Sequence, residues 1–95
     1  MTQPEKAIWK FPLNTRAELQ RIEAPYIEQV LSIQMQDETP IMWAVVWVKS
    51  PKRTHIILRF LTGEQLHGIE YKGHLGTVQL PNDGTVLHYF RGGDL

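Results

Sequence analysis

The chain has 95 residues, of which 42% are hydrophobic and 21% charged, a composition typical of one ordinary globular domain. Lysine plus arginine equals aspartate plus glutamate, ten each, which excludes both the basic excess of a general nucleic-acid binder and the strong acidity of a DNA mimic. Cysteine is absent, so the chain has no disulfide and no thiolate metal site, as expected for a protein of a reducing cytoplasm.

The predicted domain covers residues 1–95, with flexible ends at 1–6 and 91–95. Because the polar N-terminal residues lead into no apolar stretch, we expect no secretory signal. The first strand is predicted over residues 7–13. Pro12 cannot donate a hydrogen bond to a neighbouring strand, which indicates that this strand lies at an edge or ends there.

The segment that follows fits two structures. Thr15 and Glu18 have the spacing of a capping box, which favours a short helical turn near residues 15–22. Pro25 ends the segment early, however, and a helix of this length is marginal on its own. We therefore predict a strand over residues 19–24 and keep the helical turn as the alternative.

Two further strands are predicted on either side of a turn at residues 37–40. Residues 30–36 alternate between apolar and polar, which predicts a half-buried strand whose inward face carries Leu31, Ile33 and Met35. Residues 41–48 form an unbroken apolar run that is too short to cross a bilayer, since a spanning helix needs about 20 such residues. The β-branched and aromatic content of the run predicts a strand buried on both faces, with its two tryptophans in the core.

The C-terminal half ends in a predicted hairpin. Residues 55–60 alternate, and their predicted inward side chains are Ile56, Leu58 and Phe60. Residues 65–76 contain several glycines and form the longest irregular stretch. Residues 76–80 and 85–90 then read as two strands joined by a turn, because Pro-Asn-Asp-Gly at 81–84 suits a type I turn followed by a left-handed glycine.

The pattern as a whole predicts an all-β domain. Six or seven short strands at regular spacing, joined by tight turns, are typical of a small antiparallel β-sandwich or an open barrel. No internal repeat and no linker interrupts the pattern.

No residue pattern in the chain indicates catalysis or metal binding. The histidines lack the spacing of a metal-binding pair and are expected to be separate surface or rim residues; they are His55, His67, His74 and His88. The serines, Ser32 and Ser50, lack the strained turn of a catalytic nucleophile. We therefore expect no enzyme activity, no metal and no cofactor.

Charge is distributed unevenly along the chain. Residues 18–38 contain five acidic residues and one basic residue, Arg21. Residues 49–60 contain lysines and arginines but no acidic residue. The candidate anion- or partner-binding residues are therefore Lys49, Lys52, Arg53 and His55. The same residues are also explained without any binding role, as the hydrated lysine and arginine side chains of a hairpin tip. A second anion candidate is the glycine-containing segment 72–77, whose backbone N–H groups could form a small nest.

Several phrases of the sequence occur in an order that spans most of the chain. They are I-W-K-F-P-L at 8–13, I-E-A-P at 22–25 leading into V-L-S-I-Q at 30–34, M-W-A-V-V at 42–46, and G-H-L-G-T-V-Q-L at 73–80 with His88 and Phe90. Together they resemble a small domain family of unknown function that is widespread in bacteriophages and prophages. The shared positions are core and turn residues, so the resemblance implies the all-β fold and a strand at 19–24, but no catalytic residue.

The resemblance also implies a phage setting, in which small proteins without enzymatic motifs act by binding. We therefore expect a non-enzymatic, homo-oligomeric protein of the bacterial host cytoplasm that antagonises a host defence system, as an anti-CRISPR protein or a signal sponge does. It would dock a host protein through a sheet face or edge, or hold an anionic nucleotide signal with Lys49, Lys52, Arg53 and His55. No membrane is expected as a partner. The alternative is a structural or accessory phage protein without a small-molecule ligand.

Overall fold

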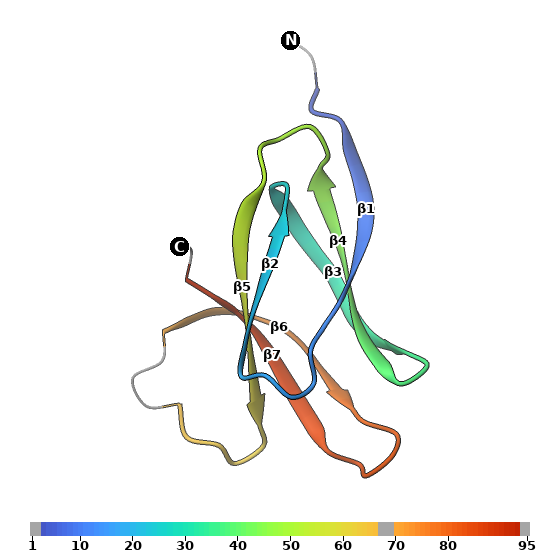
Figure 1. Cartoon of the computed structure of the whole chain (residues 1–95), viewed down its shortest axis with the longest axis vertical. Coiled ribbons are helices and arrows are strands. Elements are labelled where there is room, and N and C mark those ends of the chain that lie inside the picture. The colour runs from blue at the N-terminus through green and yellow to red at the C-terminus, as the bar shows by residue number, and fades with distance from the viewer. Residues whose placement is uncertain (1–2, 67–69, 94–95) are drawn as a thin grey trace.

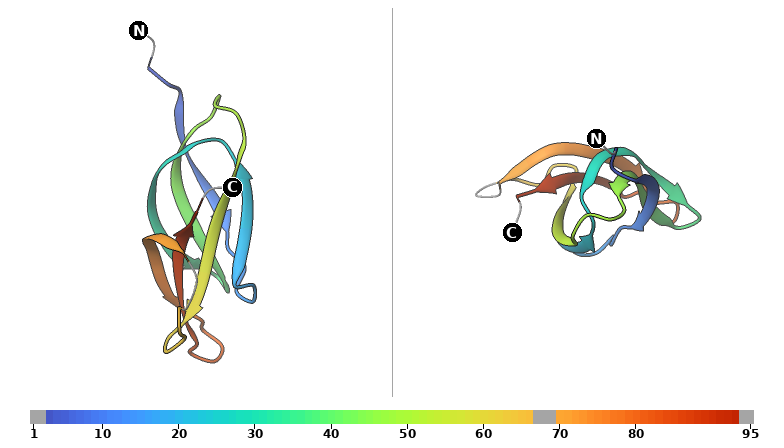
Figure 2. Two further views of the ribbon diagram at one scale, coloured as in Figure 1. Left: turned by 90° about the vertical axis from the view of Figure 1, so that its left-hand side faces the viewer. Right: turned by 90° about the horizontal axis from the view of Figure 1, so that it is seen from above.

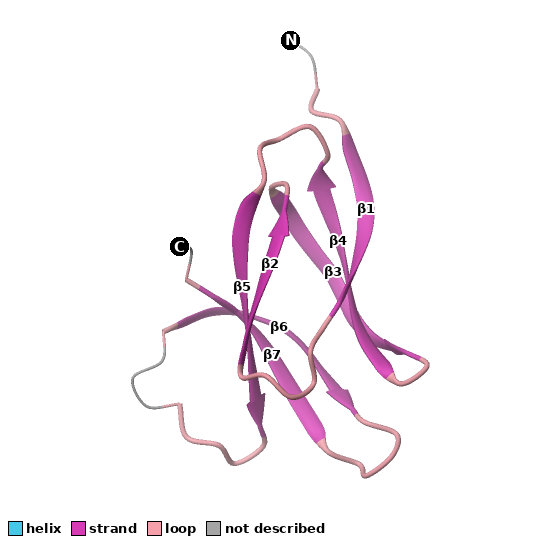
Figure 3. Cartoon of the chain, in the orientation of Figure 1, coloured by secondary structure: helices cyan, strands magenta, loops and turns pink. Residues whose placement is uncertain are grey.

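The computed structural model describes residues 3–66 and 70–93, and this part of the chain is built from β-strands without a helix (Figure 3). The strands are β1 (Lys6–Pro12), β2 (Leu19–Ala24), β3 (Ile27–Gln36), β4 (Thr39–Trp47), β5 (Arg53–Leu61), β6 (Tyr71–Gln79) and β7 (Val86–Gly92). The predicted all-β class is confirmed.

The strands form two antiparallel sheets. One sheet has the order β1-β4-β3 and the other the order β2-β5-β7-β6 (Figure 1). Seen along the long axis, the two sheets curve around a common interior without closing into a barrel (Figure 2). The arrangement is a small sandwich, and the prediction that the first strand lies at an edge is confirmed, because β1 pairs with β4 alone.

The main core lies between the inner faces of the two sheets. Met42, Ala44 and Val46 of β4 are 0% exposed and face Ile57 of β5 and Leu87 of β7. Burying an apolar side chain of this size stabilises the fold by about 1.5–3 kcal/mol. These few positions therefore supply much of the stability of a small domain.

The two sheets meet where β3 crosses β6. A Cβ atom on Gly76 of β6 would lie 2.8 Å from the Cβ atom of Ile33 on β3, a distance that real side chains do not tolerate. Ile33 is buried and cannot move aside. Only glycine at position 76 therefore lets the two strands approach this closely.

Burial of the apolar run 41–48 differs from the prediction on one of its faces. Met42, Ala44 and Val46 on the inner face are buried, as is Ile41 at the start of the outer face. The other outer residues, Trp43, Val45 and Trp47, remain partly exposed. The prediction that this strand is buried on both faces is therefore wrong for its outer face. The reason is that no other layer of the described chain covers the outside of the three-stranded sheet.

The strand that is buried on both faces is instead β5. Ile57 points into the main core, whereas the predicted inward residues form a second buried cluster on the opposite face, packed against Leu66 and Phe90; they are Ile56, Leu58 and Phe60. The predicted burial of these three residues is confirmed, but they face away from the main core. Cover on the outer face comes from Leu66, which follows β5, and from Phe90 of β7, and a periodicity argument does not take such contacts into account.

Two irregularities in β3 overturn part of its predicted alternation. Register shifts lie between Ile27 and Gln29 and between Val30 and Ser32. Each shift inserts an extra residue and reverses the direction of the side chains that follow. Leu31, predicted to face inward, is 45% exposed, and Val30 packs against the core in its place.

The segment before β2 is a turn and not a helix. The side-chain oxygen of Asn14 accepts hydrogen bonds from the backbone N–H groups of Arg16 (2.7 Å) and Ala17 (2.9 Å), which stabilises a local turn. The strand predicted over residues 19–24 is confirmed, and the alternative helical turn near 15–22 is not formed.

The C-terminal hairpin is confirmed, with longer strands than predicted. Gly84 has a φ of 75°, as the left-handed position of the turn requires, and the N–H of Leu80 bonds to the oxygen of Thr85 at 2.8 Å. β6 begins at Tyr71, so the irregular stretch is shorter than the predicted 65–76. β7 includes Arg91 and Gly92, which were predicted to belong to the C-terminal tail.

Candidate functional site

The predicted basic residues separate into an exposed group and a buried histidine. Lys49 and Lys52 are exposed in the β4–β5 connection, and Arg53 is exposed at the start of β5. The ammonium group of Lys49 lies 3.3 Å from the carboxylate of Glu5. His55 is only 2% exposed. The binding role of these residues stays a prediction, and His55 does not present its ring beside the three cations.

His55 has a clear structural contact. Its Nε2 lies 2.9 Å from the backbone oxygen of Pro25 and 3.3 Å from that of Ala24. Carbonyl oxygens only accept hydrogen bonds, so Nε2 carries the proton and donates. The ring therefore ties β5 to the connection between β2 and β3.

Two other histidines, expected to be separate, share one hydroxyl group. The Thr77 oxygen lies 2.9 Å from His74 Nε2 and 3.0 Å from His88 Nδ1, and His88 Nε2 lies 2.7 Å from the Thr62 oxygen. The hydroxyl of Thr77 has one hydrogen, so at least one of the two rings donates to it. Among residues 3–66 and 70–93, no group of histidines and carboxylates is arranged to hold a metal ion. His67 lies outside the described residues.

The outer surface of the three-stranded sheet carries an apolar patch, which we call the tryptophan face. It consists of Trp43, Val45 and Trp47 of β4 together with Ile8 of β1, which is directly opposite Val45 in the ladder. Ile8 is 62% exposed, the highest value among the large apolar side chains of the described chain. Exposed tryptophans and aliphatic residues that lie together on a rigid sheet are typical of interaction surfaces.

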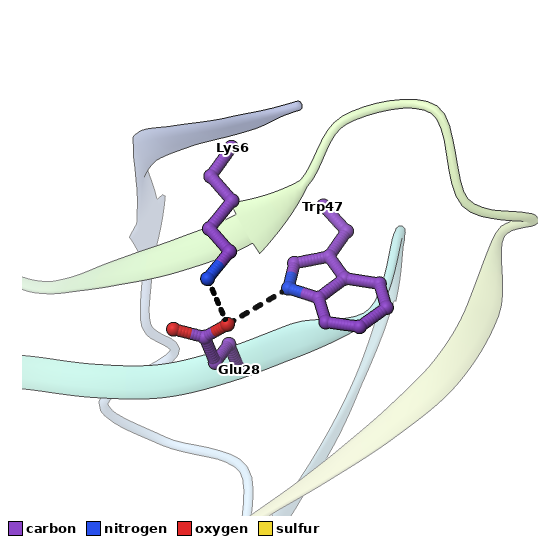
Figure 4. Close-up of polar contacts among 3 residues, drawn as sticks. All are labelled: Lys6, Glu28 and Trp47. Carbon is purple, nitrogen blue, oxygen red and sulfur yellow. Dashed lines mark hydrogen bonds and ion pairs between the residues drawn. The ribbon is translucent and has the colours of Figure 1, made fainter. Parts of the chain in front are cut away.

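Polar contacts hold one end of the tryptophan face in place. Glu28 Oε1 accepts hydrogen bonds from Lys6 Nζ at 2.7 Å and from Trp47 Nε1 at 2.9 Å (Figure 4). These hydrogen bonds lower the pKa of Glu28 below its usual value, and the bond from Lys6 has the larger effect. Trp47 is therefore fixed in orientation, with its indole N–H satisfied and its ring available for contact.

The same end connects to one of the predicted basic residues. The ring of Tyr26 packs edge-on against Trp47 with centroids 4.9 Å apart, and the Arg53 guanidinium lies 5.4 Å from the centre of the Tyr26 ring. Arg53 is thus at the border of the tryptophan face. A partner that covers Trp47 would also meet a positive charge.

The free edge of β1 borders the other side of the face. The oxygen of Glu5 accepts from the N–H of Val48 at 3.0 Å, and the N–H of Leu13 donates to the oxygen of Pro40 at 2.9 Å. Backbone groups alternate in direction along an antiparallel strand, so the odd-numbered residues of β1 bond to β4 and those of Lys6, Ile8 and Lys10 point away from the sheet. Lysines at an edge discourage pairing between copies of the same chain.

Sequence reasoning missed the tryptophan face because it assigned residues 41–48 to the core. A usable signal was present in β1, where Trp9 and Phe11 lie on one side of the strand and the apolar residue Ile8 lies on the other. Apolar residues on both sides of an edge strand indicate that its outer side is also available for contact. Ile8 was not singled out.

The comparisons with known proteins bear on family membership alone. No helix in residues 3–66 and 70–93 has the length and apolar character needed to cross a membrane. Neither a curated protein nor a solved structure matches the chain. One family model does match, described as a domain of unknown function (DUF7352), and it covers residues 4–94. The protein therefore belongs to the DUF7352 family, a family of unknown function as the sequence resemblance implied.

Proposed function

We propose that this protein is a non-enzymatic binding module that docks a partner protein through the tryptophan face. The observation that carries the proposal is the exposure of Ile8 beside partly exposed Trp43, Val45 and Trp47 on one rigid sheet. Tryptophan is the residue type most enriched among those that dominate binding energy at protein interfaces. The polar residues around the face, such as Lys6, Glu28 and Lys10, match the hydrated rim of such an interface.

The biological setting of the proposal comes from the sequence resemblance. We propose a phage-type protein in the bacterial cytoplasm whose partner is a host defence protein, which it blocks by occupying its surface. We also propose that the protein is homo-oligomeric, because its net charge of zero leaves little repulsion between copies. Native mass spectrometry measures the oligomeric state directly.

Site-specific photo-crosslinking in the bacterial host tests the docking surface. Benzoylphenylalanine is introduced in place of Ile8, and separately in place of Leu19, which is 41% exposed on β2 of the other sheet. We expect one covalent adduct of defined mass from position 8 and none from position 19. The pair is matched because both residues are exposed apolar positions on strands, so neither replacement costs core packing.

Each other outcome contradicts a specific part of the proposal. An adduct between two copies of this chain at position 8 would assign the tryptophan face to self-association. An adduct with a phage structural protein would support the alternative, an accessory virion or assembly role. Equal labelling at positions 8 and 19, or none at either, would show that the face has no preferred partner.

A further inference from the structure

A second feature, separate from the tryptophan face, is a groove between β3 and β6 at the open margin of the sandwich. It has a volume of about 370 Å³, and its walls are formed by residues 27–30 of β3, residues 72–75 of β6 and Arg91 of β7. The two strands touch at Ile33 and Gly76, where the glycine allows close approach. Small-molecule sites commonly have volumes of about 300–1,000 Å³, so the groove has room for one small ligand.

The charge of the groove is positive. Lys72 of β6 and Arg91 of β7 contribute basic groups to one wall. The ring of His74 instead packs against Phe90 on the other face of the sheet, with its Nε2 2.9 Å from the Thr77 oxygen. Glu28 is the single acid among the lining residues, and its carboxylate already accepts hydrogen bonds from Lys6 and Trp47. A groove lined in this way favours an anion, and the planar fork of an arginine suits a phosphate.

The backbone of β6 is irregular along this wall. Register shifts between Tyr71 and His74 and between His74 and Gly76 leave Lys72, Gly73 and Leu75 without a paired residue in β7. β6 is also the edge strand of its sheet. A Cβ atom added at Gly73 would meet no atom within 4 Å, so the backbone there borders open space. Bulges of this kind recur next to binding sites, and turned-out N–H groups bind anions.

The floor of the groove is apolar and deepens toward the core. A small cavity of about 20 Å³ shares part of the groove lining and is bounded on its inner side by Met42, His55 and Ile57. The shared residues are Ile27, Val30, Leu75 and Arg91. A ligand in the groove would therefore place a charged group against β6 and β7 and an uncharged body over the aliphatic side chains of β3 and β6.

We propose that this groove binds a phosphomonoester of mononucleotide size. The phosphate contacts Lys72, Arg91 and the backbone of β6 at Gly73, and the base and sugar lie over Ile27, Val30 and Leu75. This site is distinct from the one predicted at Lys49, Lys52, Arg53 and His55, although His55 borders the small cavity next to it.

Nuclear magnetic resonance titration of the full chain tests the proposal. Backbone N–H shifts are followed during addition of adenosine monophosphate, inorganic phosphate or adenosine in separate experiments. We expect the monophosphate to shift the resonances of Lys72, Gly73, His74 and Arg91. Inorganic phosphate should move the same resonances at higher concentration, and adenosine should move them least.

Two charge reversals serve as variant and matched control. Lys72→Glu places an acid in the groove, and Lys52→Glu makes the same change at an exposed lysine in the β4–β5 connection. We expect Lys72→Glu to raise the Kd for adenosine monophosphate by about tenfold or more, and Lys52→Glu to change it by less than about twofold. Both residues are exposed, so unchanged circular dichroism spectra are expected.

Three outcomes would overturn the proposal. Absence of groove shifts with the monophosphate at millimolar concentration would mean that the groove is no anion site. The reverse sensitivity, with Lys52→Glu weakening binding and Lys72→Glu not, would assign the anion to the β4–β5 connection. Equal shifts with adenosine would mean that the phosphate is not what the groove recognises.

Discussion

Tyr89 illustrates how a single side chain joins the core to a loop. It is 1% exposed and is the largest of the fully buried side chains in the described chain. Its hydroxyl donates to the backbone oxygen of Asn14 at 2.9 Å, in the connection between β1 and β2. Burial raises its pKa from 10.0 to about 12, while the positive charge of nearby Arg59 acts in the opposite direction.

This pKa difference predicts a loss of stability at high pH. The folded pKa lies above the unfolded one, so the contribution of Tyr89 is complete below pH 10 and is lost as the pH rises toward about 12. Tyr89→Phe should reduce this alkaline slope. At neutral pH it should lower the free energy of unfolding by about 1 kcal/mol, because the oxygen of Asn14 loses its donor.

Urea unfolding between pH 7 and 12 checks the prediction for Tyr89. The control is Tyr71→Phe, since the Tyr71 side chain is 46% exposed and its ring lies on the outer face of the four-stranded sheet. The control should keep the alkaline slope of the natural protein. An unchanged slope in Tyr89→Phe would contradict the assignment.

At the scale of the strand, close contacts between side chains and backbone determine where glycine is required. A Cβ atom on Gly92 of β7 would lie 2.5 Å from Ile56 Cγ2 and 2.9 Å from Ile56 Cβ. Ile56 is buried in the second apolar cluster, so it has no space to move. Gly73 of β6 has no such neighbour.

We therefore expect substitution by alanine to have opposite effects on stability at these two glycines. Gly92→Ala should destabilise the protein by about 1–3 kcal/mol through overpacking against Ile56. Gly73→Ala should be neutral or should stabilise it by up to about 1 kcal/mol, because alanine restricts the unfolded chain. The midpoint of urea unfolding measures both, and equal midpoints would contradict the close approach of β5 and β7 at this position.

At the scale of the whole molecule, the position of the interior decides which side of each sheet is buried. The three-stranded sheet has a core on one side and the tryptophan face on the other. The four-stranded sheet is covered on both sides over part of β5, by the main core and by the second cluster. The outside of the three-stranded sheet therefore keeps exposed apolar surface, with Ile8 at 62% the most exposed position. Leu19, Leu61 and Tyr71 are exposed on strands of the other sheet.

Neighbouring valines of β4 test this arrangement. Val46 is 0% exposed and faces the core, whereas Val45 lies partly exposed on the tryptophan face. Val46→Thr buries a hydroxyl and should cost about 1–3 kcal/mol of stability. Val45→Thr should cost less than about 0.5 kcal/mol, since the hydroxyl remains in contact with water. Equal losses in thermal or urea unfolding would mean that the outer face is covered in solution.

Part of the candidate site followed from sequence and part did not. Composition and charge spacing identified Lys49, Lys52 and Arg53 as exposed cations, because a run without acids next to a turn lies at the surface. The same reasoning placed His55 at the surface or rim, which is wrong, because the residue is 2% exposed and its ring bonds to the backbone oxygen of Pro25. The tryptophan face was missed because an apolar run has the same pattern whether a second layer covers it or not.

The all-β class, the edge position of β1, the strand at 19–24 and the hairpin around Gly84 could all be predicted from the amino-acid sequence. These follow from local chemistry: the missing N–H of proline, the period of side chains along a strand and the backbone freedom of glycine. Three further features depend on contacts between strands: β5 is covered on both faces, β4 keeps an open outer face, and Lys72 and Arg91 line one groove. The physical reason is that burial and convergence depend on which strands lie side by side, and contacts between distant segments leave no period in the sequence.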